Sequence, residues 1–216
     1  DVPRHLDYSQ DQHAVVLQLG GSEPNDLARS AELAQQWGYD EIDLNCGCPS
    51  ERVQRGAFGA CLMAEPNLVA ECVKAMKGAV NIPISVKHRL GLDSMDAASS
   101  EKDYQFALDF ILAVADAGAS QVTIHARNAV LKGLSPKENR SKPPLRYEVA
   151  AKLRLDAQKQ FPHLKVLLNG GLETNEQIAG HWDDFDGFMI GRAAYHFPAM
   201  LLGWDDLINT NGEAAG

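Results

Sequence analysis

Two cysteines stand one residue apart in the segment DLNCGCPS, residues 43–50, directly after a short apolar run. Cys46 and Cys48 could form a packed pair, half of a metal site or half of a redox couple, or one of them could be an acid. A metal site would also need Cys61 and Cys72, and the resulting intervals of 2, 13 and 11 residues match no paired Cys-x-x-Cys pattern. A redox couple lacks that spacing too. Cys48 lies in a Gly-Cys-Pro turn past the apolar run, and we therefore expect its thiol to face a pocket.

Polar side chains also stand at or next to the ends of six apolar runs along the chain. They are Gln18, Asn45, Lys87, His125 and Asn169, with Gly191 and Arg192 after the last run. One such residue alone would most often cap a loop, but six in the same relative position favour a shared pocket. The last two ends, NGG (169–171) and IGR (190–192), suit a phosphate, because glycine lets a ligand approach backbone N–H groups and arginine adds charged donors.

The apolar runs are predicted to be strands, and the segments between them have helical periodicity. We expect strands at residues 14–19, 41–45, 82–87, 121–126, 165–169 and 187–191. In the helix predicted over residues 22–38, Ser22 is the expected N-cap and Gly38 the expected end; residues 103–118 repeat the pattern. Thr174 and Gln177 have the spacing of a capping box. Cys72 falls on the apolar side of another helix and is expected in the core.

Alternating strands and helices predict an α/β protein with a parallel sheet. A doubly wound sheet would usually carry G-x-G-x-x-G after its first strand, and GGSEPN (20–25) does not match it. A (β/α)8 TIM barrel instead brings every strand end to one mouth, as the polar residues require. Only about six βα units are visible, so we expect the first two strands to be missing. The expected domains are a connecting segment (1–13), a partial barrel (14–203) and a flexible C-terminal tail (204–216).

Composition limits the class of protein further. The chain has 216 residues, 45% of them apolar, and a net charge of -9, which argues against a surface that binds polyanions everywhere. Residues 125–146 nevertheless contain six basic residues and one acid, so we expect a local phosphate-contacting face there. Four cysteines without secreted-scaffold spacing indicate a reducing, cytoplasmic compartment. No apolar run approaches the ~20 residues that cross a bilayer, so we expect no membrane association.

A family resemblance runs through most of the chain, from about Val15 to Pro198. It is carried by the segments NCGCPSERVQRGAFGACLM, VKHRLG, IHAR, KGLSPKENR, PPLRYE, NGG and MIGRAAYH, in that order. Together these segments resemble the motifs of tRNA-dihydrouridine synthases. The resemblance is greatest to the subgroup that acts on uridines 20 and 20a of the D-loop.

The resemblance implies a barrel enzyme that uses FMN and NADPH to reduce the 5,6 double bond of uridine in tRNA. Reduced flavin would give hydride to C6, and Cys48 would be the general acid that protonates C5. The FMN contacts implied by matching positions are Gln18, Lys87, His125, Asn169, Gly170, Gly171, Gly191 and Arg192. The implied RNA contacts are Asn45, Lys137 and Arg140, and Arg52 and Arg55 are further candidates at the rim. No metal and no particular oligomeric state are implied.

The chain departs from the family pattern in two respects, and two other functions remain possible at this stage. Cys46 stands where the family commonly has an aliphatic residue, so we expect it in the pocket wall or core. Neither the family's first strand, with its Ala-Pro-Met-like flavin motif, nor its helical RNA-binding domain is visible. One alternative is an FMN barrel acting on a free pyrimidine such as dihydroorotate, although the basic segment argues against so small a substrate. The other is an inactive truncated fragment.

Overall fold

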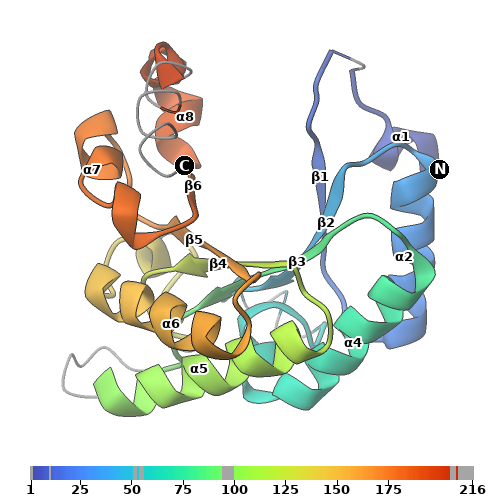
Figure 1. Ribbon diagram of the computed structural model, residues 1–216, viewed down its shortest axis with the longest axis horizontal. Helices are drawn as coiled ribbons and strands as arrows, with labels where there is room; N and C mark the ends of the chain where they lie inside the picture. Colours follow the sequence, from blue (N-terminus) through green and yellow to red (C-terminus); the bar gives the residue numbers. More distant parts are fainter. Residues whose placement is uncertain are drawn as a thin grey trace.

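The computed structural model describes residues 2–9, 11–50, 53, 56–93, 100–204 and 208. Within them six parallel strands form one curled sheet (Figure 1). They are β1 (Val16–Leu19), β2 (Glu41–Cys46), β3 (Ile84–Arg89), β4 (Gln121–His125), β5 (Lys165–Asn169) and β6 (Gly187–Met189). The order of the strands in the sheet is their order in the chain, so β1 and β6 are the two edges. This is the partial (β/α)8 barrel that the sequence predicted.

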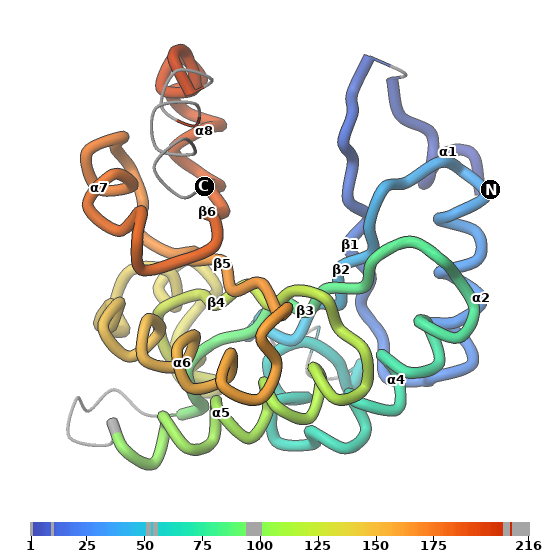
Figure 2. Tube along the Cα trace, viewed as in Figure 1, coloured from blue at the N-terminus to red at the C-terminus, as the bar shows by residue number. Residues whose placement is uncertain are grey.

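Helices follow the strands and cover the outer face of the sheet, while β1 and β6 rise on opposite sides of the opening (Figures 1 and 2). The α-helices are α1 (Val2–Leu6), α2 (Pro24–Gln36), α4 (Pro66–Ala79), α5 (Ser100–Asp116), α6 (Tyr147–Gln160), α7 (Asn175–Ala179) and α8 (Arg192–His196). The short 3-10 helices are η1 (Gly59–Ala64), η3 (Glu138–Arg140), η4 (Trp182–Asp184) and η5 (Pro198–Leu201). Among the described residues no helix is long and apolar enough to cross a membrane.

Local signals placed several helix ends correctly, although the helix predicted to start at residue 103, α5, begins at Ser100. Thr174 forms the expected capping box with Gln177 at the start of α7. Gly38 has a φ of +85°, which suits the residue that follows the end of α2. The N-cap prediction for α2 was wrong: Glu23 takes that position instead of Ser22, because Pro24, with its fixed φ, is the first helical residue.

Strand boundaries differ from the prediction by at most two residues, and the two-residue differences are in β1, β3 and β6. β1 begins at Val16, β6 ends at Met189, and β3 runs from Ile84 to Arg89 rather than ending at Lys87. Pro83 has no N–H to donate to a neighbouring strand, which explains the later start of β3. The two additional residues at the C-terminal end of β3 matter more for the site. By alternation they place Arg89 on the same face of the sheet as Lys87.

The outward-facing side chains of the central strands form the core against the helices. They are Ile42, Leu44, Ile84, Val86, Val122, Ile124, Val166 and Leu168, all fully buried. Burying a side chain of this size stabilises the fold by roughly 1.5–3 kcal/mol. Cys46 faces the same core, and Cys72 lies there as predicted. Burial raises the pKa of Cys46 well above its usual range, so this thiol stays neutral and out of reach of a ligand.

The inward-facing side chains of β2, β3 and β4 are polar, and several are linked from strand to strand. Ser85 of β3 donates to Asp43 of β2 over 3.2 Å, and Gln121 of β4 donates to Glu41 over 3.3 Å. Lys87 follows Ser85 on this face, one step nearer the C-terminal ends of the strands. Polar groups therefore lead up the inside of the sheet toward the ends of the strands.

Candidate active site

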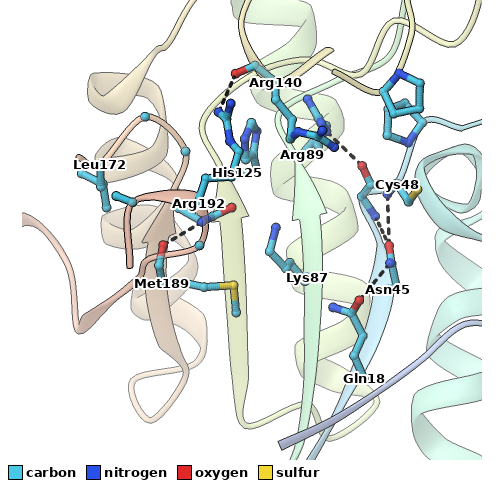
Figure 3. A pocket seen from close by; sticks show the side chains of 18 of the residues that line it. Gln18, Asn45, Cys48, Lys87, Arg89, His125, Arg140, Leu172, Met189 and Arg192 are labelled. Atoms are coloured by element: carbon cyan, nitrogen blue, oxygen red, sulfur yellow. Dashed lines mark hydrogen bonds between the residues drawn. The ribbon is translucent and has the colours of Figure 1, made fainter. Parts of the chain in front are cut away.

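A cavity of about 290 Å³ lies at the C-terminal ends of the strands (Figure 3). This is close to the lower end of the range for ligand pockets, about 300 Å³. Of the residues predicted for the site, all except Lys137 line it: Gln18, Asn45, Cys48, Lys87, His125, Arg140, Asn169, Gly170, Gly171, Gly191 and Arg192. Lys137 is exposed beside Pro136, which does line the cavity. Arg52 and Arg55 lie outside the described residues.

Cys48 is held on one side of the cavity by the turn that follows β2. The Asn45 side-chain oxygen accepts hydrogen bonds from the backbone N–H groups of Gly47 and Cys48, each over 3.0 Å. The half-buried Cys48 thiol lies 3.6 Å from the Ser50 hydroxyl and lines the cavity. The turn therefore presents this thiol to a ligand, whereas Cys46 on the strand points into the core.

A chain of amide hydrogen bonds sets the orientation of two side chains in this wall. Asn45 Oδ1 accepts the two hydrogen bonds of the turn, and this fixes the orientation of the amide group. Asn45 Nδ2 then donates to Gln18 Oε1 over 3.1 Å. Gln18 Nε2 in turn donates to the Asp43 carboxylate over 2.6 Å. Burial raises the pKa of Asp43, while the hydrogen bond from Gln18 and the charge of Lys87 act in the opposite direction.

Lys87 and His125 lie between the two ends of the cavity (Figure 3). Burial, and then repulsion by Arg89, lower the pKa of Lys87 to about 8, so the amine keeps its charge at neutral pH. Burial and the surrounding cations lower the pKa of His125 to about 2, so its imidazole is neutral. The Nδ1 atom of His125 is buried and has no hydrogen-bond partner among the described residues. This pair offers a ligand one fixed positive charge and one neutral ring.

The opposite end of the cavity is built from glycines and one arginine. Gly170 has a φ of +105°, and a Cβ there would lie 3.1 Å from His125 Nε2, so a side chain is excluded. Asn169 donates to the carbonyl of Met189 over 2.7 Å and so joins the ends of β5 and β6. Nothing lies within 4 Å of where a Cβ of Gly191 would be, and Arg192 is exposed beside it. This end is open to an anionic group.

The basic segment 125–146 forms a smaller exposed face than its composition predicted. Arg127 and Arg146 are buried; Arg146 pairs with Asp103 over 3.0 Å, and Arg127 donates to the carbonyl of Pro143. These two charges stabilise the loop instead of facing solvent. The exposed cations are Lys132, Lys137, Arg140 and Lys142, of which Lys142 is paired with Glu138 over 2.6 Å. Among them only Arg140 reaches the cavity.

Arg89 was missed by the sequence analysis. Its side chain is 4% exposed, lines the cavity and donates to three backbone carbonyl groups. Alternation along the sequence Lys-His-Arg would have placed Arg89 on the same face as Lys87. The predicted strand ended at Lys87, however, two residues too early. Within the described part of the chain, no group of three or more His, Cys, Asp or Glu side chains could hold a metal ion.

The fold and the cavity define a class: α/β-barrel proteins with a ligand site at the carboxyl ends of the strands. Comparison with known families makes the assignment narrower. The model of the family described as Dihydrouridine synthase (Dus) matches residues 2–213, and the chain belongs to this family. The resemblance found in the sequence motifs is thereby confirmed.

Curated relatives agree with this assignment. Over 201 aligned residues, the chain is 51% identical to the tRNA-dihydrouridine(20/20a) synthase of Pseudomonas putida. The aligned residues make up 93% of this chain and 57% of the relative. The protein of the same name from Xanthomonas axonopodis pv. citri is 52% identical over 213 residues, 99% of this chain and 61% of the relative. That of Vibrio cholerae is 53% identical over 204 residues, 94% of this chain and 59% of the relative. The chain thus spans about three fifths of the length of these relatives.

Proposed function

We propose that this chain forms the catalytic half-barrel of an enzyme that reduces uridine in tRNA to 5,6-dihydrouridine, using FMN and NADPH. The observation that carries the proposal is one shared cavity: the Cys48 thiol stands on one side, an arginine and open glycines stand on the other, and Lys87 lies between them. Relatives that are 51% and 53% identical to the chain over the aligned residues are named for uridines 20 and 20a, and we propose those as the substrates.

The residues of the cavity suit FMN. The open backbone at Gly191 and the exposed guanidinium of Arg192 would hold the phosphate. Gly170, where a side chain would strike His125, leaves room for a ligand against the neutral imidazole. The neutral imidazole of His125 and the charged amine of Lys87 line the cavity and would face the polar atoms of the ring. Gln18, Asn169 and Gly171 complete this set.

Bound FMN would supply the hydride that uridine accepts at C6, and NADPH would supply the reducing equivalents. The task left to this chain is the proton at C5. Cys48 Sγ holds it in the resting state, transfers it to C5 as the C5–C6 double bond is reduced, and takes a replacement from water. Each turnover therefore consumes one NADPH and one proton. The turn around Asn45 keeps the thiol pointed at the cavity throughout.

We propose that Arg140, Lys137 and Asn45 contact the RNA. Arg140 lines the cavity and Lys137 is exposed on the same loop, so both are placed to meet phosphates around the bound nucleotide. Asn45 has a more limited role, because its oxygen is occupied by the turn and one of its amide N–H groups by Gln18, so that one N–H remains to face a ligand. A donor at this point suits a carbonyl oxygen of uracil.

Two cysteine substitutions test the proposal. Cys48→Ala should keep the reduction of bound FMN by NADPH, seen as loss of flavin absorbance, yet lower dihydrouridine formation in D-loop RNA at least about 100-fold, since general acid catalysis contributes on that scale. Cys46→Ala is the matched control and should stay active, because Cys46 faces the core. Full activity of Cys48→Ala would remove the thiol from the mechanism. Turnover of dihydroorotate instead of tRNA would point to a free pyrimidine as the substrate.

A further inference from the structure

The guanidinium of Arg89 joins two loops that are far apart in the chain. Its Nε donates to the carbonyl of Gly47 over 2.9 Å, and its Nη1 donates to the carbonyls of Asn128 and Asn139 over 3.1 and 2.9 Å. Gly47 belongs to the turn after β2, whereas Asn128 and Asn139 belong to the loop between β4 and α6. The side chain is almost fully buried, so water does not compete for these bonds.

On the first loop, Arg89 controls the peptide group that leads into Cys48. The carbonyl of Gly47 and the N–H of Cys48 are the two ends of this group. Arg89 holds the carbonyl and Asn45 Oδ1 holds the N–H, over 2.9 and 3.0 Å. With both ends fixed, the peptide plane cannot rotate, and the direction in which the Cys48 side chain leaves the backbone is fixed with it.

On the second loop, Arg89 holds the peptide group that leads into Arg140. The Asn139 carbonyl is part of that group, and the fully buried Asn139 side chain fastens the rest of the loop. Its Nδ2 donates to the carbonyl of Val130 over 2.9 Å, and its Oδ1 accepts from the Val130 N–H over 2.8 Å. The backbone of Arg140 is therefore fixed while its exposed side chain lines the cavity.

We infer that Arg89 is a positioning residue that sets the separation between Cys48 and Arg140, two groups from different loops that face one cavity. The importance of that separation rests on the proposed function, in which the thiol and the guanidinium of Arg140 act on the same nucleotide. Arginine suits this role because its planar fork donates in several fixed directions at once. A lysine keeps the charge, but its three donors share one nitrogen, whereas Arg89 uses Nε for the first loop and Nη1 for the second.

Alkylation of Cys48 by iodoacetamide, followed by mass spectrometry of its peptide, tests the inference without flavin, NADPH or RNA. Arg89→Lys should raise the alkylation rate of Cys48 about tenfold, because the released turn exposes the thiol. A factor of this size corresponds to the free energy lost when one hydrogen bond to a charged group is broken. Arg127→Lys is the matched control: Arg127 is also a buried arginine, and its guanidinium donates to the carbonyl of Pro143 in the second loop. It should leave the alkylation rate of Cys48 unchanged.

The inference is overturned if Arg89→Lys leaves that rate within twofold of the wild-type value, or if both variants raise it equally. Should Arg89→Lys not fold, hydrogen exchange of the wild-type chain in increasing urea decides the matter. Residues 46–50 and 137–141 should then lose amide protection at the same urea concentration, since one side chain holds both loops; clearly separate transitions would refute the coupling. Neither measurement depends on dihydrouridine formation, so failure here leaves the proposed function to be judged by its own experiment.

Discussion

Lys87 carries its positive charge in a buried position, where desolvation disfavours the charged amine. Its pKa is lowered to about 8 from 10.5, so the folded chain binds this proton more weakly than the unfolded chain. The charge on Lys87 therefore lowers the free energy of unfolding. This loss of stability is complete below about pH 8, shrinks as the pH rises toward 10.5, and is absent above that value. A buried charge kept at such a cost is typical of a functional site.

Replacing Lys87 should therefore stabilise the protein. Lys87→Met is expected to raise the free energy of unfolding at pH 7 by on the order of 3 kcal/mol, at 1.36 kcal/mol per pKa unit, and this advantage should shrink between pH 8 and 10.5. Urea unfolding of both chains across that range measures it. Lys165→Met, at an exposed position, is the control and should show no such trend. A Lys87→Met chain less stable than wild type at pH 7 would contradict the argument.

At the residue scale, sequence reasoning worked where alternation and turn chemistry decide the outcome. It separated Cys48 from Cys46 because one lies in a Gly-Cys-Pro turn and the other on a strand, and the structure places them in the cavity and the core. It could not foresee that Arg127 and Arg146 are buried. Their burial depends on the path of a long loop and on Asp103, a partner from another helix, and neither follows from local pattern.

At the scale of elements, the loop between β4 and α6 carries the exposed cations Lys137 and Arg140 at or beside the cavity. Reversing the charges of Lys137 and Arg140 to glutamate should weaken tRNA binding at least about tenfold in low salt, and the difference should shrink as salt rises, because phosphate contacts release counterions. Filter binding or anisotropy across a salt series measures this. The loop is still held by Arg89 and Asn139, so the fold should be retained.

A second pair of lysines supplies the matched control. Lys77 lies in the last turn of α4 and Lys165 begins β5, so both lie toward the amino ends of the strands, away from the cavity, and both are exposed. Changing them to glutamate alters the net charge by the same amount. Equal losses of affinity in the two double variants would show that only the total charge matters and would remove the specific role of the loop.

Strands were more predictable than loops at this scale. All six were located to within two residues, because each is a short apolar run between turn residues. The errors arose at the ends: the strand ending at Arg89 was cut short, since a polar Lys-His-Arg sequence resembles a loop. That error hid Arg89, which joins the turn after β2 to the loop between β4 and α6.

At the scale of the whole molecule, the sheet is open between β1 and β6, and the cavity is lined from only one side of a barrel. Val16 on the inner face of β1 is 48% exposed, which shows how little covers this edge. We expect the 216-residue chain to bind FMN at least about tenfold more weakly than the full-length Pseudomonas putida relative, a difference of about 1.4 kcal/mol. Quenching of FMN fluorescence in parallel titrations measures both affinities. Equal affinities would show that the open side contributes nothing to binding.

The order of the strands has a consequence for how the chain acquires its structure during synthesis. Each strand from β2 to β6 pairs with the strand that precedes it in sequence, and the helices between them pack on their neighbours. A chain leaving the ribosome from its amino end can therefore add each new strand to an edge that already exists. No strand within the described residues waits for a partner from the far end of the chain, which keeps loop-closure costs low and shortens the time that an unpaired edge is exposed.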